Sequence, residues 1–163
     1  MKGKVRVYCR IRPFSKRELE DQTKNIKCYE KSDEMSLTVG HQRPKQYNFD
    51  AVFDQESTQE QVFEDSERLI QSAVDGYNVI IFAYGQTGSG KTFTIQGSEE
   101  NPGLTPRAIV RMFDIIREMT NFRIKLKCYM VELYLNNLRD LLLPPGEPVK
   151  ELEIKELAGK TVV

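Results

Sequence analysis

A glycine-rich run near the middle of the chain carries the clearest chemical signal. From Gly85 to Thr92 it satisfies the pattern G-x-x-x-x-G-K-[ST] at every fixed position. Glycines let the backbone wrap closely around phosphates, so that successive N–H groups point at negative charge. Lys91 supplies an ammonium for the β- and γ-phosphates, and the Thr92 hydroxyl suits Mg²⁺. The run predicts a nucleoside triphosphate site made of Gly85, Gln86, Thr87, Gly88, Ser89, Gly90, Lys91 and Thr92.

The flanking segments support this interpretation. Residues 77–84 form a nearly continuous apolar run rich in β-branched and aromatic types, which predicts a buried parallel strand. A strand, a glycine-rich turn and a helix start therefore follow in the order that phosphate binding requires. The alternative is an ordinary turn before a helix, with Lys91 in solvent. The motif alone does not separate kinases, GTPases, helicases and motors.

Length and composition exclude several classes of protein. The chain has 163 residues, 39% hydrophobic and 29% charged, which predicts one globular domain or part of one. Its 24 basic and 24 acidic residues cancel, which argues against a nucleic-acid partner. No membrane span or signal peptide is recognisable, so we expect an intracellular protein without a membrane partner. The three cysteines lack a C-x-x-C pair, and neither a disulfide framework nor a zinc site is predicted.

Before the glycine-rich run, the pattern changes from strands to a helix. Residues 4–12 alternate, with Val5, Val7, Cys9 and Ile11 on one face and a basic face opposite, which predicts a strand. Short alternating fragments between residues 25 and 53 predict a small antiparallel lobe. A capping box from Thr58 to Gln61 opens a helix that Gly76 closes.

After the run, a polar loop over residues 96–104 precedes a second helix at Thr105-Pro106. We expect that helix to carry Ile109, Met112, Phe113 and Ile116 on one face. Residues 121–133 predict a long strand, and 152–155 and 161–163 predict two short ones. The fold class expected is α/β, with a central, mostly parallel sheet flanked by helices and a small antiparallel lobe.

Four blocks together carry a family resemblance. The blocks are Arg10 to Pro13, Tyr84 to Thr94, Gly103 to Arg107, and Glu132 to Tyr134 with Asp140 to Leu142. In order and at the same spacing, they resemble the kinesin motor domain. The resemblance covers essentially the whole chain. The resemblance implies a P-loop ATPase core that binds ATP or ADP with Mg²⁺ at Thr92. It also implies that Arg10, Arg12 and Pro13 lie beside the adenine, with Phe93 on the other side of the base.

Two further segments resemble one branch of that family. Lys2 to Val7 is similar to the neck-to-motor junction of kinesins whose motor is at the carboxy terminus, and Asn101 to Ala108 is similar to its plant-type, calmodulin-binding members. This branch implies minus-end-directed movement. The residues themselves do not determine direction.

The chain also departs from the family pattern. Leu135 and Asn136 follow Tyr134 where kinesins usually read E-x-Y-N-E, and the elements N-x-x-S-S-R-S-H and D-x-A-G-S-E do not occur. Residues 156–160 imitate the second element but come too early, so we expect a hairpin turn there. Residues 1–163 are therefore expected to be the first half of a motor domain, without catalytic residues, switch elements or the main microtubule-binding helices.

The expected function is the ATP-binding part of a microtubule-based motor, an ATPase by family that is poorly active as this chain alone. We expect the parent protein on cytoplasmic microtubules, as a dimer through a stalk outside this chain. The alternative is a short kinesin-like module that binds nucleotide or a partner without motor activity.

Overall fold

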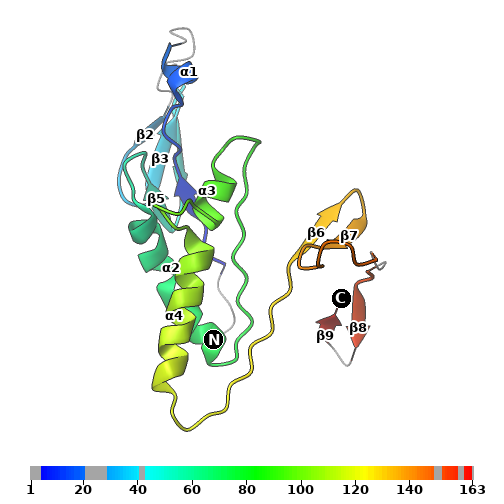
Figure 1. The fold of residues 1–163 in the computed structure, drawn as a ribbon. Helices are drawn as coiled ribbons and strands as arrows, with labels where there is room; N and C mark the ends of the chain where they lie inside the picture. The colour runs from blue at the N-terminus through cyan, green and yellow to red at the C-terminus, as the bar shows by residue number, and fades with distance from the viewer. Residues whose placement is uncertain (1–4, 21–28, 41–42, 149–151, 158–159, 163) are drawn as a thin grey trace. The chain divides into compact units, whose positions relative to one another are not determined.

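The computed structural model describes residues 5–20, 29–40, 43–148, 152–157 and 160–162 (Figure 1). The chain forms two compact units, Met1–Thr120 and Asn121–Val163. The predicted combination of helices with parallel and antiparallel strands is confirmed. Among the described residues, no helix is long and apolar enough to cross a membrane.

A parallel strand pair begins the first unit. Strand β1 (Tyr8–Arg10) pairs with β5 (Ala51–Phe53), so that Tyr8 lies opposite Ala51. Tyr8 also meets Phe53 edge to face, with ring centroids 6.1 Å apart. The expected strand over residues 4–12 is thus shorter. Tyr8 packs on the core while Val5 and Val7 are exposed, because the core is built around Phe53.

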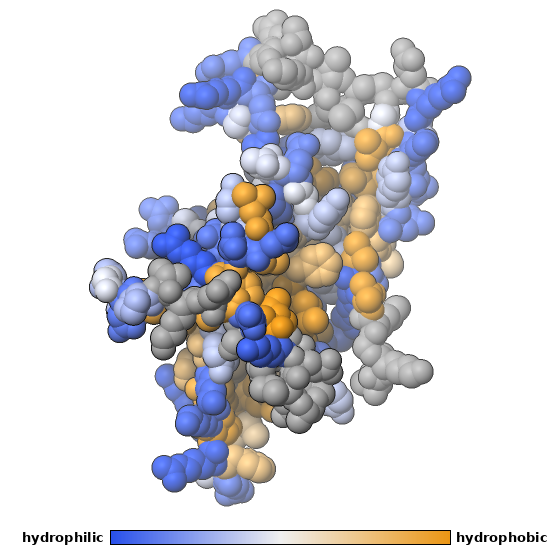
Figure 2. Space-filling model, turned by 90° about the vertical axis from the view of Figure 1, so that its right-hand side faces the viewer, coloured by the Kyte–Doolittle hydropathy of each residue, from blue (hydrophilic) through white to orange (hydrophobic). Residues whose placement is uncertain are grey.

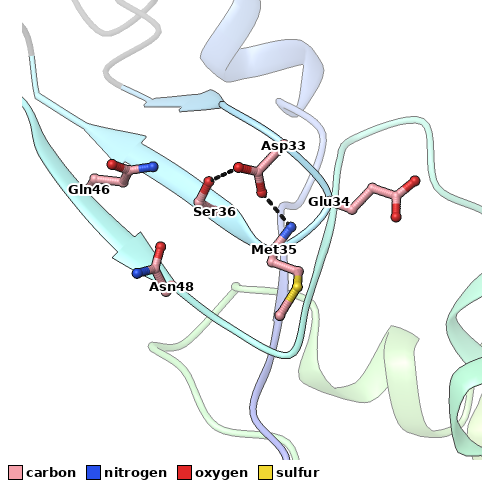
Figure 3. A pocket seen from close by; sticks show the side chains of 6 residues that line it. All are labelled: Asp33, Glu34, Met35, Ser36, Gln46 and Asn48. Atoms are coloured by element: carbon pink, nitrogen blue, oxygen red, sulfur yellow. Dashed lines mark hydrogen bonds between the residues drawn. The ribbon is translucent and has the colours of Figure 1, made fainter.

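The predicted antiparallel lobe is confirmed. Strand β3 (Ser36–Val39) lies between β2 (Tyr29–Lys31) and β4 (Lys45–Asn48), and both pairings are antiparallel. The turn between β2 and β3 is closed by Asp33, whose carboxylate accepts hydrogen bonds from the Met35 N–H and the Ser36 hydroxyl (Figure 3). The Ser36 hydrogen bond, above all, lowers the pKa of Asp33. The lobe residues Ile26 and Cys28 lie outside the described part of the chain.

Helix α2 (Gln59–Val74) follows its sequence pattern closely. The Thr58 side chain accepts a hydrogen bond from the Gln61 N–H, and the Gln61 side chain accepts one from the Thr58 N–H, so the predicted capping box is present. Gly76, at φ +95°, follows the last turn. The buried stripe is Gln59, Val62, Ser66 and Ile70, which recur at helical spacing. A short helix α1 (Lys16–Glu20), which the sequence did not predict, precedes the lobe.

The predicted second helix is α4 (Leu104–Glu118), which lies beside α2 (Figure 1). Its buried residues are Leu104 and Ile115, whereas Ile109 and Phe113 are exposed. The helix packs through another stripe, because Leu104, Ala108 and Ile115 also recur at helical spacing. Arg107 of α4 also forms an ion pair with Glu60 of α2.

Two expected strands are not formed as predicted. Residues 77–84 run as an extended segment without a strand (Figure 1), and Ile80, Phe82 and Tyr84 are 84%, 78% and 95% exposed. Only the end of the segment predicted over 121–133 is a strand, β6 (Val131–Tyr134). A strand is held by ladder hydrogen bonds to a neighbour, and no described strand pairs with 77–84 or with 121–129. Large apolar side chains therefore remain at the surface (Figure 2).

The second unit contains two antiparallel pairs. Strand β6 pairs with β7 (Asn137–Asp140), and β8 (Lys155–Leu157) pairs with β9 (Lys160–Val162). The β8–β9 pair confirms the expected hairpin, although residues 158–159 of its turn lie outside the described residues. The turn between β6 and β7 consists of Leu135 and Asn136, both with positive φ.

Replacing Leu135 with asparagine is expected to stabilise this hairpin by about 0.5–1 kcal/mol. Leucine at φ +47° brings its Cβ against the backbone, whereas asparagine tolerates the left-handed region. Little apolar burial is lost, because Leu135 is 77% exposed. Slower amide hydrogen exchange in β6 and β7 would show the effect. Leu135→Val, which adds β-branching at positive φ, should speed exchange, and an equal response to both changes would contradict this account.

Candidate nucleotide-binding site

The predicted phosphate loop curls back on itself in the first unit. The Ser89 N–H donates to the Gln86 carbonyl at 3.2 Å, and a Cβ placed on Gly85 would lie only 2.5 Å from the Ser89 hydroxyl oxygen. Gly85 therefore cannot carry a side chain without displacing Ser89. Gly90, at φ +93°, leads directly into helix α3 (Lys91–Ile95). The motif thus forms the tight, glycine-dependent turn that its sequence predicts.

Lys91 is held at this turn by backbone oxygens. Its ammonium donates hydrogen bonds to the carbonyls of Gly85 and Gln86 at 2.9 and 2.8 Å. The ammonium therefore already lies on the loop, and an anion bound there would compete with two carbonyl oxygens for it. This position fits the phosphate-binding role expected of Lys91.

The start of α3 offers the other groups that a metal-bound phosphate chain needs. Among the described residues, no acceptor takes the N–H groups of Gly90, Lys91 and Thr92, and the exposed Thr92 hydroxyl makes no hydrogen bond. Free N–H donors suit phosphate oxygens, and a free hydroxyl oxygen is a ligand type that Mg²⁺ accepts. These residues fit a Mg²⁺–nucleotide complex.

Arg10 and Phe93, two of the predicted adenine contacts, lie together. The guanidinium carbon of Arg10 is 5.3 Å from the centroid of the Phe93 ring. Nη1 of Arg10 donates to the Gln59 side-chain oxygen at 2.6 Å and to the Thr94 hydroxyl at 3.0 Å. Partial burial lowers the pKa of Arg10, because the charged form loses water.

Arg12 runs alongside the phosphate loop. A Cβ on Gly90 would lie 3.8 Å from Cγ of Arg12, so the aliphatic part of that side chain borders the turn. Its Nη2 contacts both oxygens of Glu18 at 2.5 and 2.7 Å. Pro13 follows at the exposed surface. The structure therefore brings two segments of the chain together here: the run with Arg10 and Arg12, and the phosphate loop with the helix α3 that carries Phe93.

The Glu18 carboxyl has a lowered pKa. Hydrogen bonds from Ser15, first its backbone N–H at 2.7 Å, and then from Arg12 lower the pKa of Glu18 from 4.5 to about 2. The ionised carboxylate contributes its stabilisation fully above pH 4.5, and this contribution is lost as the pH falls through about 2.

An NMR titration of the Glu18 carboxyl is therefore expected to have its midpoint near pH 2, with Arg12 losing its partner in the same pH range. Arg12→Ala should raise the pKa of Glu18 only in part, because Ser15 is the larger cause. A midpoint near 4.5 in the unsubstituted chain would show that the Ser15–Glu18–Arg12 contacts do not persist in solution.

Sequence reasoning missed three residues of this site. Gln59 and Thr94 bind Arg10, and Glu18 binds Arg12. A signal for Gln59 was present, because its amide occupies the first position of the helical stripe that continues at Val62. A signal for Glu18 was present too, because Ser15 and Glu18 have the S-x-x-E spacing of a capping box and exchange its two hydrogen bonds. Thr94 ends the block that resembles the family, but its contact with Arg10, 84 residues away, is set by the fold.

An open hollow in the antiparallel lobe is separate from these groups (Figure 3). Its lining residues are Asp33, Glu34, Met35, Ser36, Gln46 and Asn48, none of which is a predicted nucleotide contact. The Asp33 carboxylate is already occupied by Met35 and Ser36. The hollow is a feature of the lobe turn and not part of the candidate site.

Comparison with known proteins agrees with the resemblance seen in the motifs. The kinesin motor domain family model matches residues 10–163. The chain is 56% identical over 161 residues to kinesin-like protein KIN-14I of Oryza sativa subsp. japonica, covering 96% of this chain and 13% of that protein. It is 53% identical over 161 residues to KIN-14E of Arabidopsis thaliana, covering 96% and 12%. For KIN-14B of Oryza sativa subsp. japonica, the identity is 49% over 177 residues, covering 99% and 21%.

Proposed function

Since this chain belongs to the kinesin motor family, we propose that it is the ATP-binding part of a motor that couples ATP hydrolysis to movement along microtubules. The chain spans 13% and 12% of the length of two relatives, so the activity and partners of a whole motor enter here as a proposal. Similarity to KIN-14 proteins confirms the predicted branch. Calmodulin binding and minus-end direction stay predictions.

One observation carries the proposal. The ammonium of Lys91 lies on a glycine-dependent loop whose following N–H groups have no acceptor among the described residues. Arg12 and Phe93 border the same loop. A phosphate-binding turn beside an aromatic ring and guanidinium groups suits a nucleotide, which has an anionic end and a flat base.

Each group has a distinct task in this proposal. The loop N–H groups and Lys91 bind the phosphate chain, and Thr92 ligates Mg²⁺. The Thr92 hydroxyl would hold the ion, which would supply positive charge to neutralise the phosphates. Phe93 and the R-x-R-P segment, which contains Arg10, Arg12 and Pro13, orient the adenine. These residues bind and position, and none of them activates a water molecule.

We also propose that residues 1–163 correspond to the first half of a motor domain. N-x-x-S-S-R-S-H and D-x-A-G-S-E do not occur in this sequence. In the family, these elements orient the attacking water and respond to the γ-phosphate. We therefore expect nucleotide binding by this chain with little turnover. The parent motor would act on cytoplasmic microtubules, as a dimer through a stalk outside this chain.

Calorimetric titration with ATP, with and without Mg²⁺, tests the site directly. We expect binding that strengthens with Mg²⁺, because Thr92 and the phosphates share the metal. Turnover measured in parallel should not rise when microtubules are added. Binding that is independent of Mg²⁺ would contradict the metal role of Thr92, and no binding at all would contradict the nucleotide site in this chain.

A second candidate function is a short kinesin-like interaction module. It is favoured by the extended segment 77–84, where Ile80, Phe82 and Tyr84 are exposed and no described strand pairs with the backbone. Such an edge can pair with another chain. Sedimentation would show self-association or a stable complex in this case. Microtubule-stimulated turnover by this chain alone would contradict both the binding module and the poorly active ATP-binding part.

A further inference from the structure

The contact between Arg10 and Phe93 leaves no room for a base between them. Their separation is 5.3 Å from guanidinium carbon to ring centroid. A base stacked between two flat groups needs about 3.5 Å on each side, or about 7 Å in all. In this structure Arg10 therefore covers one face of the ring rather than forming the opposite wall of an adenine slot.

The rest of Phe93 remains accessible. The residue is 47% exposed although Arg10 lies over its ring, so part of its surface is open to a ligand. Aromatic rings and nucleobases stack face to face with an offset, and one open face is enough. A base can therefore stack on Phe93 from the side that Arg10 does not cover.

A single buried amide holds both members of this contact. Gln59 is only 5% exposed, and its side-chain oxygen accepts the Arg10 hydrogen bond at 2.6 Å. Its side-chain nitrogen donates to the Phe93 carbonyl at 2.7 Å and to the Asn101 carbonyl at 3.4 Å. Gln59 thus fixes the guanidinium on one face of the ring and also the backbone from which the ring projects.

We propose that Gln59 is a positioning residue for adenine, and that Arg10 acts through Phe93 by supporting the ring from behind. This inference rests on the proposed nucleotide site and deepens it. Neither residue needs to touch the base. Gln59 holds Arg10, and Arg10 restricts the ring to an orientation in which its open face can receive the purine.

Inorganic tripolyphosphate separates this role from a general effect on folding, because it has the phosphate chain of ATP without the base. Calorimetry with Mg²⁺ would compare both ligands in the unsubstituted chain, Gln59→Met, Phe93→Ala and the double variant. Methionine keeps the length of glutamine without its hydrogen bonds. Gln71→Met is the matched control on the same helix, because the Gln71 amide binds Asp75 at the exposed surface.

We expect Gln59→Met to weaken ATP binding about tenfold while tripolyphosphate binding changes by less than about twofold, as expected for lost stacking. Phe93→Ala should weaken ATP binding by a similar factor. The double variant should bind ATP no more weakly than Phe93→Ala alone. Arg10→Met should behave like Gln59→Met, both alone and combined with Phe93→Ala. Gln71→Met should bind both ligands as the unsubstituted chain does.

Three results would overturn the inference: unchanged ATP affinity in Gln59→Met, an equal loss for ATP and tripolyphosphate, or losses that add in the double variants. An equal loss would include a variant that fails to fold, and additive losses for Arg10→Met would indicate direct contact with the base. Failure of the proposed function gives a different result, because the unsubstituted chain would then bind neither ligand.

Discussion

Lys91→Ala is expected to abolish measurable ATP binding by this chain, together with any ATP turnover. The ammonium lies 2.9 and 2.8 Å from the carbonyls of Gly85 and Gln86, at the turn that would hold the phosphates. Its removal takes away charge-assisted hydrogen bonds to the β- and γ-phosphates, which predicts a loss of affinity of about 100-fold or more. Calorimetric titration with Mg²⁺ and ATP measures this loss.

Lys45→Ala is the matched control, because Lys45 is an exposed lysine of β4 in the antiparallel lobe. It removes the same charge and should leave ATP affinity unchanged. Thermal unfolding of both variants should match the unsubstituted chain, since the carbonyls that Lys91 releases lie at the surface of the loop and can bind water. If Lys91→Ala bound ATP as the unsubstituted chain does, Gly85–Thr92 could not be the phosphate site.

Gly97→Ala is expected to destabilise the first unit by about 2–5 kcal/mol. Gly97 has φ +75°, and a Cβ there would overlap the Asn101 carbonyl oxygen and the Gly103 nitrogen. Both obstacles are backbone atoms, which cannot rotate away as the end of a side chain can. Asn101 also accepts a hydrogen bond from Gln59, so a shift of this loop would disturb the support of Phe93. Urea unfolding measures the change in stability.

Gly76→Ala provides the comparison for Gly97→Ala. Gly76 also has a positive φ, at +95°, but a Cβ there would meet nothing within 4 Å. We therefore expect a cost of only about 1–2 kcal/mol, from the backbone conformation alone. A similar loss for both substitutions would mean that the loop at Gly97 relaxes to accept the methyl group, and that its close packing adds no rigidity.

Features set by neighbouring residues could be predicted from the sequence. The capping box of α2 joins Thr58 and Gln61, which are three positions apart, and the phosphate loop is one continuous run. The β2–β3–β4 lobe also pairs segments that are close in the chain. Hydrogen bonds over such short separations need only the local conformation that the residue types favour, so a pattern of types is sufficient to predict them.

Contacts between distant segments could not be predicted in this way. Arg10 meets partners 49 and 84 residues away, and no periodicity in the chain relates those positions. The apolar spacing of α4 places Ile109 and Phe113 on one face, but both are exposed, and the buried residues of the helix are Leu104 and Ile115. Likewise, the composition of residues 77–84 favours a strand, but a strand also needs a neighbour to bind.

The sequence by itself determined that the chain has a phosphate-loop motif at Gly85–Thr92, that it resembles kinesin motors, and which residues are candidates to meet a base. The tertiary structure alone decided how those residues contact one another. It placed Arg10 on Phe93, Arg12 along the loop, and the buried Gln59 between the ring's backbone and the guanidinium. The physical reason is that the phosphate loop is a local property of the backbone, whereas a base-stacking surface is assembled from segments that only folding brings together.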